Sequence, residues 1–354
     1  MRSRSILGWV LAVLGVILLA GAAVLHWVVV PGQAKLPSDE NDTRTYDGTA
    51  KVLVVPQALA AGDQARAILT NVPVKATQQV QVLASTSSAA QVSDKRAVST
   101  ATGQGIASTS YTYAVDRKTL EATSDHPSDW NVVAHQGLTV SFPIGAKKQN
   151  YTGWVADTQT TTPVTYTKEE QRNGITTYVY TIDVKPTPIK SQQILGALPP
   201  SLPTNLLGSL ATSLPIPDQL KTALAQALPK LPNPVPLAYT YSSTATYWVE
   251  PTSGRVIDVQ QEEIRQAGLA NLTGVPGIPI YDVTTRTTSS SVNDAVNEAN
   301  HDASKINKYS KTWPLILLIV GGVALIVGIV LLVTGRRRHL PPSGLPPVSP
   351  APMT

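Results

Sequence analysis

The chain has 354 residues, of which 14% are charged, and it contains no cysteine. The lack of cysteine excludes disulfides, thiolate metal sites and cysteine nucleophiles. A charged fraction below the roughly 25% of soluble proteins favours a membrane or envelope protein. The net charge of +5 comes from basic residues in the two tails, because residues 31–312 hold equal numbers of acidic and basic side chains. No nucleic-acid partner is therefore expected.

Two apolar segments predict one transmembrane helix at each end of the chain. Residues 6–30 lack a formal charge, and at about 1.5 Å per residue they can cross a ~30 Å hydrocarbon core. Residues 314–334 form a second such run. Basic residues in the two terminal tails, 1–5 and 335–354, predict that both tails are cytoplasmic and that 31–312 is an extracytoplasmic domain. The Pro-rich tail 335–354 is predicted to be disordered. A cleaved signal peptide is the alternative for the first segment, because small residues lie at positions 20–23.

Small residues recur every seven positions in both apolar segments. They are Gly8, Gly15 and Ala22 in the first segment, and Gly321, Gly328 and Gly335 in the second. Such a seam predicts close packing of the two helices against each other or against copies of the chain. The ordinary frequency of glycine in membrane helices is the alternative explanation.

The segment between the apolar helices predicts an antiparallel, β-rich ectodomain, so the fold class is membrane-anchored and mainly β, with some helix (α+β). Alternating β-branched and aromatic residues between turn signals predict nine strands. These are 51–55, 74–83, 108–116, 138–142, 164–168, 175–184, 238–250, 255–264 and 281–290. Pro251 and Gly254 predict a hairpin turn at 251–254. Helices are predicted at 57–69 and 292–307.

Residues 194–237 hold twelve leucines and predict a helical hairpin inserted between two strands. Leu206, Leu207, Leu210 and Leu214 share one face of its first helix, and Leu220, Leu224, Leu228 and Leu231 share one face of its second. Asp218 is a candidate N-cap of the second helix. One interpretation is that both faces complete the core of the domain. The other is that they remain available as a surface for a lipid, the membrane or a protein partner.

Candidate catalytic and metal-binding residues are few. The sequence has no GxSxG, HExxH or phosphate-binding P-loop motif. Glu169 and Glu170, like Glu262 and Glu263, are adjacent, so on a strand they point to opposite faces and do not form an acid/base pair. Asp125, His126, Asp129 and His135 are possible zinc ligands, but they lie in a polar, proline-containing loop, where such residues usually stabilise turns. We expect no enzymatic activity, cofactor or metal.

Four stretches of the chain resemble the actinobacterial PorA-like family. They are GLTVSFP at 137–143, Lys147-Lys148 with the stretch 151–157, NGITTYVY at 173–180 and TYWVEPTSGRVIDV at 246–259. The resemblance implies a domain of unknown function with a helix at each end and no catalytic residue. A porin in the usual sense would need many lipid-facing strands, whereas two helices meet that requirement here.

The sequence therefore favours a non-enzymatic protein of the plasma membrane whose ectodomain binds a lipid or another apolar component of the envelope. A structural or interaction protein that recruits an envelope partner or self-associates is the second hypothesis. An oligomeric, porin-like channel is the third.

Overall fold

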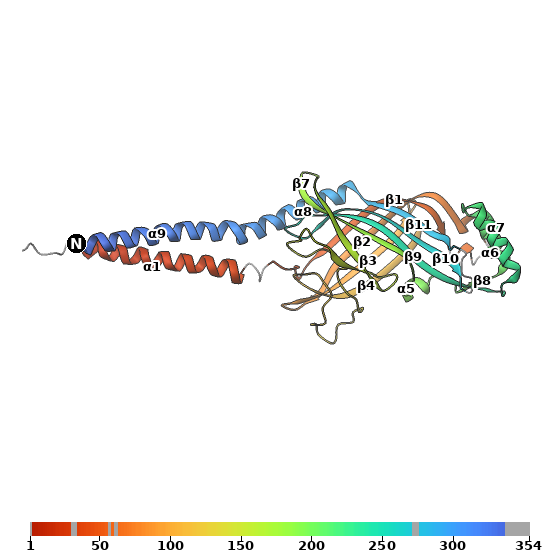
Figure 1. Cartoon of the computed structure of the whole chain (residues 1–354), viewed down its shortest axis with the longest axis horizontal. Coiled ribbons are helices and arrows are strands. Elements are labelled where there is room, and N and C mark those ends of the chain that lie inside the picture. The colour runs from red at the N-terminus through yellow and green to blue at the C-terminus, as the bar shows by residue number, and fades with distance from the viewer. Residues whose placement is uncertain (1, 30–33, 56–57, 60–62, 271–275, 337–354) are drawn as a thin grey trace, which may run out of the picture. The chain divides into compact units, whose positions relative to one another are not determined.

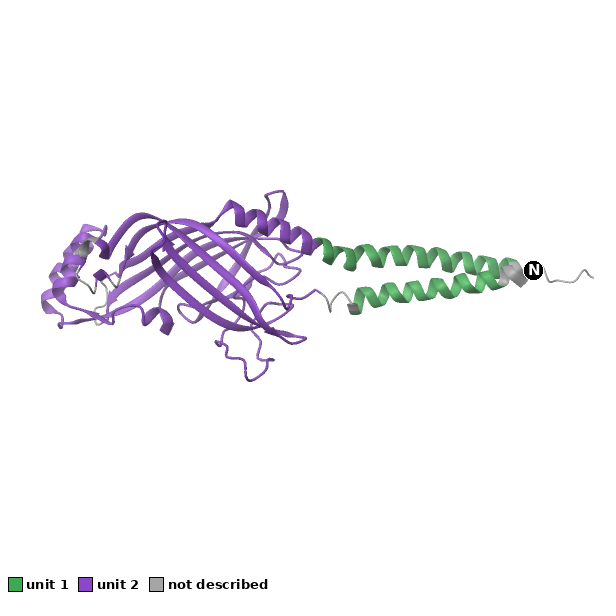
Figure 2. Ribbon diagram, turned by 180° about the vertical axis from the view of Figure 1, so that it is seen from behind, with its two compact units in different colours: residues 1–33, 304–354 green, residues 34–303 purple. Residues whose placement is uncertain are grey.

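The computed structural model describes residues 2–29, 34–55, 58–59, 63–270 and 276–336 (Figure 1). The chain divides into two compact units (Figure 2). The smaller unit comprises residues 1–33 and 304–354, and the larger unit comprises residues 34–303.

The smaller unit is a pair of apolar helices. It consists of α1 (Arg2–Val24), the π-helical turn η1 (Leu25–Val29), a second π-helical turn η3 (Lys308–Thr312) and α9 (Trp313–Arg336). By length and composition both helices can cross a membrane. Most of their large side chains are exposed, as expected for helices surrounded by lipid rather than by protein.

Glycines lie where α1 and α9 approach each other most closely. A Cβ atom on Gly15 would lie 2.7 Å from the carbonyl oxygen of Gly321 and 2.7 Å from the amide nitrogen of Leu325. A Cβ atom on Gly328 would lie 2.8 Å from the carbonyl oxygen of Gly8. Any side chain at these positions would force the helices apart, so the seam serves a contact within one chain.

Replacing Gly15 with leucine should therefore destabilise the helix pair. The side chain would meet the backbone of α9, and overpacking of this kind typically costs about 1–3 kcal/mol. We expect a lower unfolding temperature of the detergent-solubilised protein, followed by circular dichroism. Gly21→Leu is the matched control, because no atom lies within 4 Å of a Cβ at that position. Equal unfolding temperatures of the two variants would contradict the observed packing.

The larger unit is built on one curled antiparallel sheet in the order β4-β3-β2-β1-β11-β10-β9-β7-β6-β5, with the short β8 paired to β9. The strands are β1 (Asn41–Val54), β2 (Ile68–Ser85), β3 (Ala89–Thr100), β4 (Gly105–Asp116), β5 (Tyr151–Val155), β6 (Thr160–Arg172), β7 (Ile175–Pro188), β8 (Ser201–Leu202), β9 (Val235–Val249), β10 (Val256–Leu269) and β11 (Ile278–Thr287). The helical elements are α4 (Gln64–Ala67), α5 (Gln192–Leu195), α6 (Thr204–Ser213), α7 (Asp218–Ala227), η2 (Leu228–Lys230) and α8 (Ser289–Asn307). Hairpins link most neighbours, and β11 returns to pair with β1.

The antiparallel, β-rich prediction is confirmed, and eight of the nine predicted strands overlap observed strands. The predicted strand at 138–142 is wrong, because this segment is a loop whose apolar residues pack against the sheet. Strands β3, β5 and the short β8 were not predicted. The helix predicted at 57–69 is wrong at its C-terminal end, because Ile68 pairs with Val54 and begins β2. Residues 57 and 60–62 of this prediction lie outside the described residues.

The predicted turn at 251–254 is confirmed, and it packs against the loop at 141–143. Gly254 has a φ of +75°, which a residue with a side chain rarely adopts. Its carbonyl oxygen accepts a hydrogen bond from the Ser141 hydroxyl at 3.1 Å. A Cβ at Gly254 would lie 2.4 Å from the carbonyl oxygen of Pro143. The SFP and PTSG motifs therefore form one contact.

Residues 117–150, which we call the closing strap, connect the two edges of the sheet. The amide of Leu138 donates to the carbonyl of Thr152 on β5 at 2.8 Å, and its carbonyl accepts from Trp154 at 2.8 Å. On the other side Leu138 forms a bridge with Glu121, and the next residue, Ala122, forms a bridge with Val115 on β4. Backbone hydrogen bonds thus run from β4 through the strap to β5, so the curled sheet is closed there.

Arg255 holds the start of β1 and helix α8 against the β9–β10 hairpin. Its guanidinium donates to Glu40 at 3.0 Å, to Glu298 at 3.1 Å and to Asp302 at 2.9 Å. Although burial alone would lower the pKa of Arg255, the surrounding carboxylates raise it, so the side chain stays charged. Removing it would leave several carboxylates without their partner.

His135 should make the strap sensitive to acid. Its ring packs on Tyr113 at a centroid distance of 4.8 Å, and its Nε2 atom is buried without a hydrogen-bond partner among the residues that the structure describes. Burial lowers its pKa below the usual value of about 6.5, and no charged group contributes to this shift. The folded state therefore takes up the proton less readily than the unfolded state, so stability is complete above about pH 6.5 and falls as the pH decreases.

We expect His135→Gln to flatten the dependence of the unfolding temperature between pH 7.5 and pH 5. His126→Gln serves as the control, because His126 is hydrogen-bonded to the carbonyl of Pro127 and stacks on Trp130, both in its own loop. A pH dependence that is the same in wild type and in His135→Gln would show that this histidine does not control the strap.

Candidate apolar binding site

The leucine-rich insertion forms the predicted helical hairpin, consisting of α6 and α7. Prolines precede both helices and adopt an extended conformation, so each helix begins immediately after a proline. The predicted N-cap role of Asp218 is wrong. Pro217 occupies the N-cap position and Asp218 is the first helical residue, where its carboxylate still favours the positive end of the helix dipole.

The leucine faces of the hairpin pack inward. Five of the eight candidate leucines are buried in one apolar cluster, and the other three are partly buried against it. The buried ones are Leu207, Leu210, Leu214, Leu220 and Leu224, and the others are Leu206, Leu228 and Leu231. Side chains from strand ends, among them Val52, Val235 and Ile278, cover these faces, which agrees with the interpretation that they complete the core. Their role as a surface for a lipid or a partner stays a prediction.

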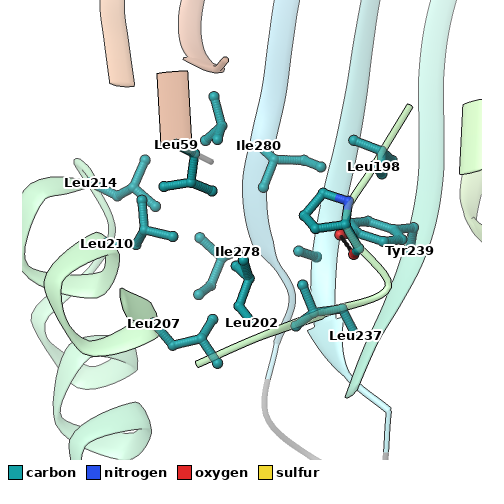
Figure 3. Close-up of a pocket in the computed structure, with 13 residues that line it drawn as sticks. Leu59, Leu198, Leu202, Leu207, Leu210, Leu214, Leu237, Tyr239, Ile278 and Ile280 are labelled. Carbon is teal, nitrogen blue, oxygen red and sulfur yellow. Dashed lines mark hydrogen bonds between the residues drawn. The ribbon is translucent and has the colours of Figure 1, made fainter. Parts of the chain in front are cut away.

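An apolar pocket lies between α6 and the sheet (Figure 3). It has an empty volume of about 510 Å³, part of which is open to solvent. Three hairpin leucines form one wall, and the ends of β1, β9, β10 and β11 and the segment before α6 form the rest. The lining residues are Val54, Leu59, Leu198, Pro199, Leu202, Leu207, Leu210, Leu214, Leu237, Tyr239, Ala267, Ile278 and Ile280.

The polar groups at the pocket are already paired. Tyr239 is the lining residue with a polar side chain, and its hydroxyl donates to the carbonyl of Pro199 at 2.6 Å. Burial raises the pKa of Tyr239 to about 12, so the phenol is neutral near pH 7. The pocket therefore offers a ligand neither a charge nor a nucleophile, and dispersion and the hydrophobic effect are the available binding forces.

The other candidate residues are not brought together. Asp125 accepts a hydrogen bond from Ser88 at 3.1 Å, the His126 ring stacks on Trp130, and His135 lies against Tyr113. Within the described residues, no three metal-binding side chains form a group. The adjacent glutamates pair with different partners: Glu169 with Lys148 and Glu170 with Lys168, and Glu262 with Lys51 and Glu263 with Tyr241.

Most of the pocket lies outside the hairpin, in residues that sequence reasoning missed. Tyr239 and Ala267 lie opposite each other near the ends of predicted strands, so they share one face of the sheet. Sequence reasoning could not show that four strand ends meet α6, since this depends on the order of strands in the sheet.

Comparisons with known proteins give a family. A family model described as PorA, Porin PorA, matches residues 7–330. No curated protein matches the chain. Among solved structures, the chain is similar to a protein described as a MaoC domain dehydratase from Chloroflexus aurantiacus J-10-fl, with 11% identity, covering 81% of this chain and 91% of that chain. Its TM-score of 0.15 is too low for the likeness to support an argument.

Leu224→Ala should test the inward packing of the hairpin. This side chain is 2% exposed, and truncating a buried leucine typically costs about 2–5 kcal/mol. We expect a clearly lower unfolding temperature for this variant, measured on the detergent-solubilised protein, whereas Gln226→Ala at an exposed position of the same helix should change little. Unchanged stability of Leu224→Ala would contradict the inward packing of the leucine face.

Proposed function

Because the chain belongs to the Porin PorA family and its smaller unit carries two apolar helices, we propose that it is a cell-envelope membrane protein whose larger unit binds an apolar chain. The observation that carries this proposal is the pocket beneath α6, whose thirteen lining residues present almost only carbon. The acyl chain of a lipid is an envelope component with this chemistry. We infer that the protein acts by binding it rather than by catalysis.

The arrangement of the pocket supports a role for the hairpin as its movable wall. Leu207, Leu210 and Leu214 reach the pocket from α6, whereas the opposite wall is fixed in hydrogen-bonded strands. The two ends of the hairpin are joined by the pairing of β8 with β9 and by a hydrogen bond from the Thr204 amide to the Asn233 side chain at 3.2 Å. A small displacement of α6 beyond these links would lengthen the pocket without breaking the sheet.

The family and the two apolar helices indicate a membrane location. We propose that α1 and α9 anchor the protein with both tails in the cytoplasm and residues 31–312 outside, as the flanking arginines predict. Trp27 and Trp313 are exposed near the ends of these helices, where aromatic rings favour the headgroup region.

An oligomeric channel receives less support from the helices. Their glycine seam is occupied by the contact between α1 and α9 of one chain, and their exposed side chains are mostly apolar. A water-filled pore would need polar groups along its wall. His26 is the titratable residue within the apolar run of α1 and η1, and it lies 3.4 Å from the carbonyl of Ser310. Partner recruitment remains the alternative function of the larger unit.

Fluorescence titration with 11-(dansylamino)undecanoic acid tests acyl-chain binding. Ala267 lines the pocket, so Ala267→Leu fills space that the chain would occupy, and we expect the dissociation constant to rise at least about tenfold. Ala238→Leu is the matched control, because Ala238 is exposed on the neighbouring strand β9, opposite Gly268. The control should bind as the wild type does.

Absence of a saturable signal with the wild type would contradict the proposal. So would equal affinity of Ala267→Leu and Ala238→Leu, since the probe would then bind elsewhere on the protein.

A further inference from the structure

A second group of side chains lies on the inner face of the curled sheet, apart from the apolar pocket. We call Tyr46, Gln78, Arg96, Tyr247 and Glu263 the inner polar patch. They belong to five strands, β1, β2, β3, β9 and β10. None of the five lines the pocket, because they lie further along the strands than the pocket-lining residues Tyr239 and Ala267.

The strand registers place all five residues on one face. Directly opposite residues on neighbouring strands point the same way, and so do residues two apart on one strand. Arg96 lies opposite Gln78, and Ala76, two residues before Gln78, lies opposite Tyr46. The same rule places Glu263 and Tyr247 on the face of Tyr46. The directly opposite pairs Ala50–Val283, Val283–Glu263 and Glu263–Ser243 connect β1 to β9. Tyr46 is four residues from Ala50, and Tyr247 is four residues from Ser243, so both point to the same face.

This face is the inner one, because side chains on it reach across to other parts of the unit. Arg265, two residues after Glu263, donates to Asp157 at 2.8 Å, beyond the far end of β5. Tyr111, which is opposite Asp94 and so on the same face as Arg96, is hydrogen-bonded to Ser191 at 2.6 Å. Contacts between segments so far apart in the sheet order are those expected on the concave side of a curled sheet.

Solvent nevertheless reaches the inner polar patch. The side chain of Arg96 is 47% exposed, although that of its partner Asp94 is only 4% exposed. Tyr46, Gln78, Tyr247 and Glu263 are also partly exposed. A ligand could therefore contact these groups without unfolding the sheet.

The patch combines hydrogen-bond donors and acceptors at nearly balanced charge. Tyr46 donates to Gln78 at 3.1 Å, Gln78 donates to Asp94 at 2.9 Å, and Arg96 donates to Asp94 at 3.2 Å. One oxygen of Glu263 accepts from Tyr241 at 2.9 Å. Arg96 is paired with Asp94, and Glu263 lies on the same face. The patch therefore presents both signs of charge, and a strongly charged ligand of either sign would meet a like charge there as well as an opposite one.

The tyrosines add neutral donors and flat apolar surfaces. Burial raises the pKa of Tyr46 and of Tyr247, so both phenols keep their protons near pH 7. A phenol both donates and accepts hydrogen bonds, while its ring packs against C–H groups. The arginine, glutamine and glutamate supply the remaining donors and acceptors in fixed directions.

We propose that the inner polar patch binds an uncharged, hydroxyl-rich ligand, that is, a saccharide. Each hydroxyl group of a saccharide both donates and accepts a hydrogen bond, which this mixture of Arg96, Glu263, Gln78 and tyrosine side chains can satisfy. The absence of net ligand charge avoids the repulsion described above. This site is independent of the acyl-chain site, and either can exist without the other.

Isothermal titration of the full-length protein with maltotriose, in a detergent that has no sugar headgroup, tests this site. We expect saturable binding that Arg96→Gln and Glu263→Gln each weaken at least about tenfold, which corresponds to about 1.4 kcal/mol, because each change removes the charge from a hydrogen-bonding group. Lys95→Gln and Glu262→Gln are matched controls on the same strands, because their side chains point to the opposite face. The controls should bind maltotriose as the wild type does.

Absence of maltotriose binding by the wild type, with native circular dichroism, would overturn the proposal. Binding of inorganic phosphate or tetramethylammonium in place of maltotriose would also overturn it, since the patch would then select charge. A loss in both control variants equal to that in Arg96→Gln and Glu263→Gln would place the sugar on another surface. Fluorescence titration of the same variants with the acyl probe reports separately on the pocket.

Discussion

The larger unit depends on how the two edges of its sheet are satisfied. An unpaired strand edge exposes a row of backbone donors and acceptors, which is a liability for aggregation. Here the closing strap pairs with both edges. Its Ala122 forms a bridge with Val115 on β4, and its Leu138 forms a bridge with Gly153 on β5. Further along β4, the side-chain amide of Gln193 donates to the carbonyl of Ser110 and accepts from its amide, as a neighbouring strand would. These bonds hold the sheet in its curled form and give it an inner face.

The inner face changes character along the strands. At the end covered by α6 the inner face is apolar. The next residues on this face, Tyr241 after Tyr239 and Arg265 before Ala267, begin a polar layer. Arg265 lies in that layer with Asp157, stacked over Tyr281 at 4.5 Å. A buried ion pair of this kind contributes little net stability, but it fixes the register of groups that would otherwise be unsatisfied. The apolar pocket and the inner polar patch are thereby kept apart on one continuous sheet.

Sequence reasoning predicted the local elements better than their assembly. Alternation in 175–184 and 238–250 predicted β7 and β9, because both strands pack one apolar face. Strand β3 was missed, since its inward residues include Asp94 and Arg96, which a pattern of apolar alternation does not recognise. Segment 138–142 was predicted as a strand because its inward residues are apolar, but these residues pack the closing strap against the sheet. The family match confirms the resemblance carried by the short motifs.

We propose that an acyl chain occupies the pocket between α6 and the sheet. The most direct measurement is photocrosslinking with a diazirine-bearing palmitic acid in membranes that contain the full-length protein, followed by peptide mass spectrometry. We expect labelled peptides from α6 and from β11, where Leu210 and Ile278 line the pocket, in addition to those from the two apolar helices. Labelling confined to α1 and α9 would contradict it.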